Sequence, residues 1–257
     1  MPELPEVETI VRKLAPQLTG HTVMQAEFLA PRVLRGSPVP EIEGRTILAL
    51  ERYGKHILVR FENGVLSIHL GMTGKLLLDG AETPYTRARI TLGRGVLLFD
   101  DIRQFGRMEW NPGRLELLGP EPLTITPGEF RGRLKQRRTP IKALLLDQKF
   151  VRGVGNIYAD ESLFRARIHP LAIASRLSTA RAGRLHEAIV EVLSAAIENR
   201  GSSVSDYVDS EGRQGSFQTF HQVYQRENLP CLVCGSPVRR VVVAQRGTHY
   251  CPQCQRR

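Results

Sequence analysis

The sequence predicts an α+β chain with several domains: a strand-rich N-terminal domain led by one helix, a helical domain, and a small cysteine-bearing C-terminal segment. Three observations support this prediction. Short apolar runs separated by turn residues fill 45–99, a cluster of turn formers at 119–128 ends that pattern, and all four cysteines lie between 231 and 254. The expected domain ranges are 1–120, 128–222 and 226–257.

The composition favours a polyanionic partner. The 257 residues include 36 Lys and Arg against 26 Asp and Glu, which gives a net charge of +10 and a pI near 9.9. This excess of positive charge suits a protein that binds nucleic acid, but the excess alone does not prove such binding. Because no apolar run approaches the roughly 18 residues of a membrane span and the N-terminus lacks a signal-peptide pattern, we expect no membrane partner and a cytosolic protein.

The first eight residues combine a helix start with an unusual proline. Pro5 suits the first helical turn, and apolar residues follow at the spacing of one buried helix face: Val7, Ile10, Val11 and Leu14. A helix alone does not explain Pro2 and Glu3. If Met1 is removed, Pro2 becomes a free secondary amine, and because α-amino groups have a pKa of about 7.7 to 8, such an amine can act as a nucleophile near neutral pH.

The strand-rich region contains alternating apolar runs and short turns. Expected strands occupy 45–60, 65–70, 74–78, 88–92 and 96–99. Glu62-Asn63-Gly64 between the first two is a hairpin signal, because Asn-Gly tolerates positive φ. This turn spacing predicts a sandwich or a barrel.

The helical region holds two features that could bind an anion. A basic run contains Arg131, Arg133, Lys135, Arg137, Arg138 and Lys142, and it is either a solvated helix face or a phosphate-binding surface. Gly153-Val154-Gly155-Asn156 joins two helices, so Asn156 is an N-cap candidate, and the same helix N-terminus could receive a phosphate. Further on, the Ser- and Gly-rich stretch 201–220 suggests a mobile loop or lid.

The cysteines predict one structural zinc ion. Cys231 and Cys234 form one C-x2-C pair, Cys251 and Cys254 form another, and such pairs supply four thiolates to a tetrahedral Zn²⁺. Redox dithiols are the alternative. Between the pairs we expect a strand over 238–244 and a turn over 245–248 that presents arginine to phosphate.

These parts together closely resemble bacterial formamidopyrimidine-DNA glycosylases, also called 8-oxoguanine DNA glycosylases, over the full length of the chain. The matching motifs are Pro2-Glu3-Leu4-Pro5-Glu6-Val7-Glu8-Thr9, Tyr53-Gly54-Lys55, His69-Leu70-Gly71-Met72, Arg103-Gln104-Phe105-Gly106, Gly153 to Tyr158, and the zinc finger with Gln245-Arg246. The resemblance implies a β-sandwich, a helix-two-turn-helix domain and a zinc finger. It also implies a monomer that acts on double-stranded DNA containing oxidised bases or abasic sites.

The resemblance also implies catalytic roles. Pro2 attacks C1′ of the damaged nucleotide and forms a Schiff base, so that β- and δ-elimination can follow without any cofactor beyond zinc. Glu3 protonates the sugar ring oxygen, which requires a proton-bearing group within about 3 Å. Glu6 orients Pro2 or its water. Lys55 serves as the acid of β-elimination and as a phosphate contact. Arg246 serves as a phosphate clamp and as the acid of δ-elimination, although arginine is a poor acid.

DNA-contacting residues follow from the same resemblance. Phosphates flanking the lesion would be held by His69, Arg137, Lys142 and Asn156. Met72, Arg103 and Phe105 would fill the hole that the extruded base leaves, with Arg103 bonded to the orphaned partner base. Periodicity alone instead favours Met72 and Phe105 as core residues. The loop 201–220 would close over the flipped base.

Two departures from the family pattern and two rival functions remain. Ser205 stands where relatives often carry a basic residue, and Arg87-Ala88-Arg89 stands where many have a His-x-His pair. An endonuclease VIII-like enzyme would use the same proline on oxidised pyrimidines. A zinc-finger DNA-binding protein without catalysis is the alternative from another class.

Overall fold

The computed structural model describes residues 1–34, 36–204 and 207–256, which fall into two compact units. The first unit comprises Met1–Glu116 and Ile197–Gln218, and the second comprises Leu117–Ala196 and Thr219–Arg257. The three ranges expected from the sequence follow chain order, whereas the first unit takes its last segment from beyond the helical region. Those three ranges stay a prediction.

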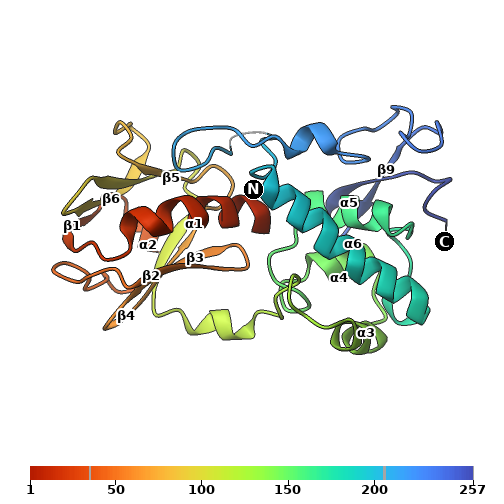
Figure 1. Cartoon of the computed structure of the whole chain (residues 1–257), viewed down its shortest axis with the longest axis horizontal. Helices are drawn as coiled ribbons and strands as arrows, with labels where there is room; N and C mark the ends of the chain where they lie inside the picture. Colours follow the sequence, from red (N-terminus) through yellow and green to blue (C-terminus); the bar gives the residue numbers. More distant parts are fainter. Residues whose placement is uncertain (35, 205–206, 257) are drawn as a thin grey trace. The chain divides into compact units, whose positions relative to one another are not determined.

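The chain begins with helix α1, Leu4–Leu18, as its apolar spacing predicts. Pro5 lies in the first turn, and Val7, Ile10 and Leu14 are buried. The helix ends before Gly20, whose φ of +84° is accessible at little cost only to glycine. Figure 1 shows α1 lying along the strands of the first unit, and an ion pair of 2.7 Å between Glu8 and Arg52 joins it to strand β2.

Two antiparallel sheets, each of four strands among the described residues, make up the rest of the first unit. One sheet has the order β1 (Val23–Phe28), β6 (Thr86–Leu92), β7 (Val96–Asp100), β5 (Lys75–Leu78), and the other β2 (Ala49–Tyr53), β3 (His56–Phe61), β4 (Gly64–His69), β8 (Arg107–Trp110). Buried apolar side chains of both sheets and of α1 form one core. The sandwich predicted from the sequence is therefore confirmed. The short helices α2 (Pro31–Leu34) and η1 (Gly113–Leu117) complete the unit.

The expected strand 45–60 is wrong as a single element. It is a hairpin, because Gly54 and Lys55 form a two-residue turn between β2 and β3, and Tyr53 pairs with His56. Gly54 has a φ of +62° there. An apolar pattern that continues through a tight turn does not reveal that turn, and a Gly-Lys pair is a weaker signal than Asn-Gly.

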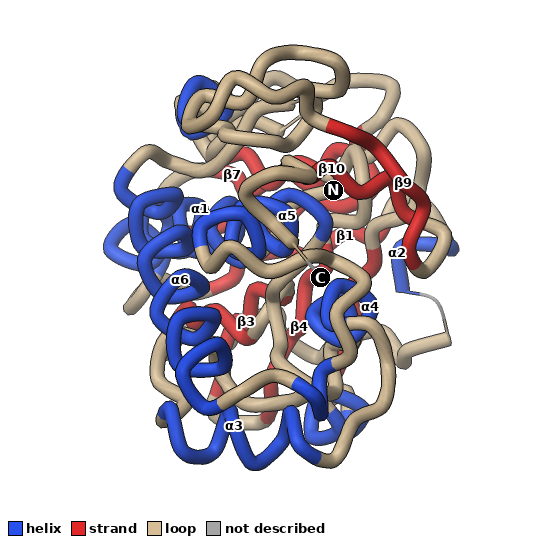
Figure 2. Tube along the Cα trace, turned by 90° about the vertical axis from the view of Figure 1, so that its right-hand side faces the viewer, coloured by secondary structure: helices blue, strands red, loops and turns tan. Residues whose placement is uncertain are grey.

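The second unit is helical apart from one hairpin (Figure 2). Its helices are α3 (Pro127–Lys135), α4 (Ile141–Leu146), α5 (Asn156–Arg165), η2 (Ala174–Arg176) and α6 (Thr179–Glu198), the last of which runs into the segment 197–218. The short helix η3 (Phe217–Phe220) begins at the end of that segment. Within the described residues, no helix has both the length and the apolar character needed to cross a membrane.

The hairpin pairs β9 (Arg239–Val243) with β10 (Arg246–Tyr250). Its turn is Ala244-Gln245, with φ of +49° and +59°, so the expected turn over 245–248 is wrong. Arg246 is the first residue of β10 and pairs with Val243. A turn with positive φ at both central residues usually contains Asn or Gly, and therefore an Ala-Gln turn could not be recognised from the sequence.

Candidate functional site

Pro2 and Glu3 are buried at the start of α1. Glu3 is 3% exposed, and its backbone N–H donates to Glu6 Oε2 at 2.8 Å. The two glutamates form a capping box, which satisfies backbone N–H groups of the first turn. The positive end of the helix dipole also favours carboxylates at this place. The structure thus brings Pro2, Glu3 and Glu6 together.

The second oxygen of Glu6 holds a segment almost 200 residues away in the sequence. Its Oε1 accepts the backbone N–H of Ser202 at 2.7 Å. Gly201 has a φ of +75°, and a Cβ at this position would lie 2.6 Å from Glu6 Oε1. The Tyr207 hydroxyl donates to the carbonyl oxygen of Glu6 at 3.3 Å. The start of the expected lid is therefore fastened to the helix beside Glu3.

A second attachment of this segment lies two turns further along α1. Lys13 Nζ donates to Asp209 at 2.6 Å and to Glu211 at 2.9 Å. Burial alone would lower the pKa of Lys13, but its bonds with the two carboxylates outweigh burial and raise that pKa. Burial would likewise raise the pKa of Asp209, yet Lys13 and two backbone N–H groups lower it. Both groups are therefore charged at neutral pH.

Lys55 and His69 lie at one end of the sheet β2-β3-β4-β8. Lys55 is 8% exposed in the β2–β3 turn, while His69 ends β4 and pairs with His56 across the sheet, with ring centroids 4.8 Å apart. Burial, followed by nearby positive charge, lowers the pKa of His56 to about 3 and that of His69 well below its usual range. His69 Nδ1 accepts the Gly71 N–H at 3.1 Å, so a neutral His69 carries its proton on Nε2 as a donor.

The three expected wedge residues are exposed on neighbouring loops of the first unit. Met72 is 41% and Phe105 45% exposed, so neither belongs to the core. The Arg103 guanidinium carbon lies 4.7 Å from the centre of the Phe105 ring, a cation–π contact that orients both side chains.

Buried Asp101 joins the two loops that carry these residues. Its carboxylate accepts the Thr73 hydroxyl at 2.5 Å and the Gly106 N–H at 2.7 Å, and Thr73 in turn accepts the Arg103 N–H at 3.1 Å. A Cβ on Gly71 would lie 2.5 Å from the backbone of Phe105. The two loops therefore approach so closely that only glycine fits at position 71. Asp101 thereby fixes the spacing between Met72 and Phe105.

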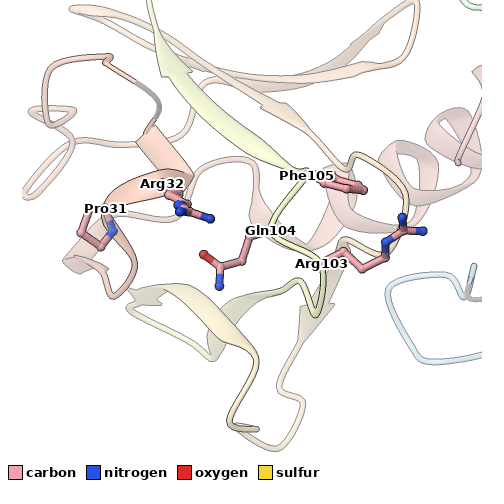
Figure 3. Close-up of a pocket in the computed structure, with 5 residues that line it drawn as sticks. All are labelled: Pro31, Arg32, Arg103, Gln104 and Phe105. Carbon is pink, nitrogen blue, oxygen red and sulfur yellow. The ribbon is translucent and has the colours of Figure 1, made fainter.

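A surface pocket lies beside Arg103 and Phe105 (Figure 3). Pro31 and Arg32 of α2 line one side and Gln104 another, and Figure 3 shows the Arg32 and Gln104 side chains facing the same hollow. Gln104 has a φ of +52°. Guanidinium, amide and ring groups on one surface suit contacts with nucleotide bases.

In the second unit, a glutamine side chain holds the glycine turn before α5. Gln148 donates to the Val154 carbonyl at 2.8 Å and accepts the Gly153 N–H at 2.8 Å. The N-cap expected at Asn156 is wrong, because Gly155 occupies that position and Asn156 is the first helical residue. The Asn156 side chain instead donates to the carbonyl of Gly247 in β10 at 3.0 Å.

Lys142 is enclosed by the unit rather than presented on its surface. Its side chain is 0% exposed, and its ammonium group donates to Asp160 and, at 3.1 Å, to the Asn156 carbonyl. The other Asp160 oxygen accepts the backbone N–H of His249 at 2.9 Å. The expected phosphate contact of Lys142 stays a prediction.

The remaining basic residues expected at the site lie on the surface of the second unit. Arg246 is exposed at the start of β10, and Arg137 is exposed just after α3. The Arg137 carbonyl accepts the Ser175 N–H at 2.9 Å, which holds this loop against η2. Both guanidinium groups are thus in reach of a ligand.

The four cysteines meet the requirements of a zinc site. Their sulfur atoms lie within 4.8 Å of one another, which is compatible with a tetrahedron whose Zn–S distances are about 2.3 Å. Hydrogen bonds from Ser236 lower the pKa of Cys234 to about 6, which favours the thiolate that binds metal. Gln255 accepts the Cys251 N–H at 2.8 Å and donates to the Ile168 carbonyl at 2.9 Å, so the site is tied to the end of α5.

The two departures from the family pattern have different outcomes. Arg87 and Arg89 lie on β6; Arg87 donates to the Asp101 carbonyl at 3.0 Å, and Arg89 forms ion pairs with Glu27 and Glu82. Ser205 lies outside the described residues.

Sequence reasoning did not single out the carboxylates that hold these segments. Asp101, Asp160, Glu161 and Asp209 are at most 3% exposed, and each accepts backbone N–H groups. A usable signal existed only for Asp160 and Glu161, because these two adjacent acids lie between the apolar runs Ile157–Ala159 and Leu163–Phe164 of one helix.

Three family models match successive parts of the chain. They are described as the formamidopyrimidine-DNA glycosylase N-terminal domain at 1–108, the formamidopyrimidine-DNA glycosylase H2TH domain at 118–208, and a zinc finger found in FPG and IleRS at 228–257. The zinc-finger match and the four-cysteine cluster together give the chain one structural zinc site.

Full-length relatives carry the same description. The formamidopyrimidine-DNA glycosylase of Solibacter usitatus is 56% identical, over 100% of both chains, and that of Thermus thermophilus is 50% identical, over 99% of this chain and 98% of its own. A crystal structure of the Thermus thermophilus protein has a TM-score of 0.91 at 48% identity, covering 99% of this chain and 98% of that one. A Lactococcus lactis Fpg mutant in complex with Fapy-dG-containing DNA has a TM-score of 0.91 at 34% identity, covering 100% of both.

Proposed function

The chain belongs to the formamidopyrimidine-DNA glycosylase family, and we propose that it excises oxidised purines from duplex DNA through Pro2 and then cleaves the strand by β,δ-elimination. The observation that carries the mechanism is the buried arrangement of Pro2 and Glu3 at the start of α1, with Glu6 bonded to the Glu3 backbone. In the 257-residue chain Met1 makes the Pro2 nitrogen an amide, so activity requires removal of Met1.

Each bond change has a residue to support it. The Pro2 nitrogen bonds to C1′ while the bond from C1′ to the damaged base breaks, and Glu3 gives its proton to the sugar ring oxygen as the ring opens. The resulting iminium group makes a C2′ proton acidic, and loss of that proton expels the 3′ phosphate in β-elimination. Loss of a second proton, from C4′ of the conjugated product, expels the 5′ phosphate in δ-elimination. Water then releases Pro2 from the sugar fragment.

Glu6 acts as a positioning residue for Pro2. Its Oε2 accepts the Glu3 N–H and its Oε1 accepts the Ser202 N–H, so a single carboxylate fixes the backbone next to the nucleophile and the start of the loop 201–220. The loop closes over the extruded base. Positioning of both parts by one side chain links base capture to attack on C1′.

The first unit also supplies Lys55, His69 and the wedge. Lys55 is the acid of β-elimination, and His69 donates from neutral Nε2 to a phosphate, since burial holds its pKa below the neutral range. Exposed Met72 and Phe105 enter the base stack, while Arg103 bonds the partner base. Filling the hole offsets an unstacking cost of about a few kcal/mol.

The second unit contributes phosphate contacts through exposed Arg137 and Arg246 and through Asn156. One side-chain amide N–H of Asn156 donates to the Gly247 carbonyl, and the second N–H of the same group can donate to a phosphate. Lys142 supports this surface from inside. Such contacts set the register of DNA without reading sequence, which suits a monomeric repair enzyme that works wherever damage occurs. We place this activity in the bacterial cytosol, at the nucleoid.

Borohydride trapping tests the mechanism, because it reduces a Schiff base to a stable amine. We expect the protein lacking Met1 to become covalently joined to a duplex that contains 8-oxoguanine opposite cytosine, with a mass that places the sugar fragment on Pro2. The Pro2→Gly protein should trap at least about tenfold less, because glycine supplies a primary amine in a less constrained place. Tight binding without any trapping by the wild-type protein would leave only a DNA-binding function.

A further inference from the structure

Asp160 joins three segments of the second unit. It lies on α5 and is 1% exposed. One carboxylate oxygen receives the Lys142 ammonium group from α4, and the other accepts the backbone N–H of His249 in β10 at 2.9 Å. A single side chain therefore connects two helices to the hairpin of the zinc finger.

A second side chain of α5, one turn before Asp160, also bonds β10. Asn156 Nδ2 donates to the Gly247 carbonyl at 3.0 Å, and the Asn156 carbonyl accepts Lys142 Nζ at 3.1 Å. Gly247 and His249 are two residues apart, so they face the same way along β10. Asp160 and Asn156 together bind the edge of β10 that does not pair with β9, and they fix its position along α5.

Arg246 is the residue that this attachment places. It precedes Gly247, is exposed, and follows a turn whose residues Ala244 and Gln245 both have positive φ. Residues other than glycine persist at positive φ only where the surrounding structure holds them. The bonds at Gly247 and His249 supply that support directly beside Arg246.

We infer that Asp160, neutralised by buried Lys142, is a positioning residue that holds Arg246 where it binds the phosphate backbone of lesion-containing DNA; this rests on the phosphate contact of Arg246 in the proposed function. The carboxylate is needed because a neutral side chain here would take from the buried Lys142 ammonium group the charge of Asp160 that it bonds. Lys142 in this arrangement acts through Asp160 and Asn156.

A double-mutant cycle tests the coupling. The probe is a duplex that carries a tetrahydrofuran abasic analogue, which the lyase cannot cleave, and the measured quantity is Kd at several salt concentrations. We expect Asp160→Asn to weaken binding about tenfold and to reduce the slope of log K against log salt by about 0.9, the effect of losing one phosphate contact. Arg246→Gln should give the same slope change, and the double variant should lose little more than either single variant.

Arg103→Gln in the first unit provides the matched control. Its effect should add fully to that of Asp160→Asn, because the two residues share no partner. Full additivity between Asp160→Asn and Arg246→Gln, or an unchanged slope in Asp160→Asn, overturns the inference. If Asp160 served only the stability of the fold, the coupling of Asp160→Asn to Arg246→Gln would equal its coupling to Arg103→Gln.

A second variant covers a failure of Asp160→Asn to fold. Asp160→Ala with Lys142→Met removes both buried charges, so no unpaired charge remains. We expect it to bind one zinc ion per chain, like the wild type, and still to show the reduced salt slope; a normal slope contradicts the inference. Borohydride trapping at low salt and saturating protein separates the two proposals, because it should persist in Asp160→Asn, whereas a wild type that does not trap refutes the Pro2 mechanism itself.

Discussion

Each unit has a lysine–aspartate pair whose aspartate belongs to a functional segment or holds one, and the two pairs differ in their access to water. In the first unit, Lys13 of α1 bonds Asp209 at 2.6 Å; the Lys13 side chain is 22% exposed and that of Asp209 is 1% exposed, so water reaches the pair from the lysine side. In the second unit, the side chains of Lys142 and Asp160 are both 0% exposed. A partly hydrated pair exchanges readily with water and salt, whereas a buried pair cannot separate without leaving a bare charge.

The difference matches what each segment has to do in the proposed reaction. The segment 197–218 must open to admit a damaged nucleotide and then cover it, so a pair that separates at little cost suits it. The hairpin that carries Arg246 must keep its place through both elimination steps. Access to water therefore distinguishes a releasable attachment from a permanent one.

The neighbouring glutamates follow the same distinction. Glu6 accepts one backbone N–H from the loop, that of Ser202. Glu161 accepts three consecutive N–H groups, from Gln222, Val223 and Tyr224, at 2.8 to 3.0 Å. Burial raises the pKa of Glu161 even though these three bonds oppose the shift. The chain entering the zinc finger is consequently held by three bonds to one buried carboxylate, whereas the bonds that hold the loop are divided between Glu6 and Lys13.

Among the variants that test this comparison, Lys142→Met should lower the free energy of unfolding the most. It leaves Asp160 buried without a counter-charge, which costs about 3–5 kcal/mol of unfolding free energy. The transition followed by far-UV circular dichroism in urea should move to lower concentration for the zinc-loaded protein. Trp110, the only tryptophan, lies on β8 in the first unit, so its fluorescence transition should move less.

Lys149→Met is the matched control, because Lys149 belongs to the same unit and is exposed. It should change the unfolding free energy by less than about 0.5 kcal/mol. If Lys142→Met were equally mild, the Lys142–Asp160 pair would not be the permanent attachment that the comparison requires.

Gly201→Ala should have an intermediate effect, now on the first unit. The φ of +75° disfavours alanine, and the added Cβ would lie 2.6 Å from Glu6 Oε1, so we expect a loss of about 1–3 kcal/mol. The Trp110 transition should shift, and single-turnover excision of 8-oxoguanine should slow because Glu6 also holds the Glu3 backbone. Gly128→Ala serves as the control, since a Cβ there meets nothing within 4 Å. Equal behaviour of the two variants would refute the link through Glu6.

The features that could be predicted from the sequence are those that local chemistry decides. Proline position and apolar spacing defined α1, and the two C-x2-C pairs defined the zinc site. Alternating strands with turn signals predicted a sandwich or a barrel, and the two four-stranded sheets are a sandwich. The motif match also identified Met72 and Phe105 as candidates for exposure against the periodicity that favours a core.

The errors arose where distant segments decide the local structure. Asn156 looked like an N-cap, but it bonds Gly247, which is 91 residues away. The turn beside Arg246 uses Ala244 and Gln245 at positive φ, which neither residue signals. Likewise, nothing near Lys142 in sequence indicated that its partner Asp160 would lie on the next helix.

Lys13→Met should have the smallest effect on stability and the most specific effect on function. Lys13 is partly exposed, and Asp209 keeps the backbone N–H groups of Glu211 and Arg213 as donors without it, so the loss of the pair should cost less than about 1 kcal/mol. The bound carboxylates raise the pKa of Lys13, so its contribution is present below its usual pKa and is lost only as pH rises through the higher folded value. The lowered pKa of Asp209 gives a contribution present above its usual pKa and lost only as pH falls through the lower folded value. The stability difference from wild type should therefore stay constant between about pH 5 and 9.

The functional test of Lys13→Met compares two substrates. Because a loop that covers the extruded base matters only when a base is present, excision of 8-oxoguanine should slow about two- to fivefold while cleavage at an abasic site stays within error. The difference should shrink as salt rises and screens the pair in the wild type. Arg12→Met removes the same charge from α1, but Arg12 bonds Glu8 and not the loop, so both rates should match wild type. Equal slowing on both substrates would mean that the attachment through Lys13 supports the whole unit and not the releasable loop.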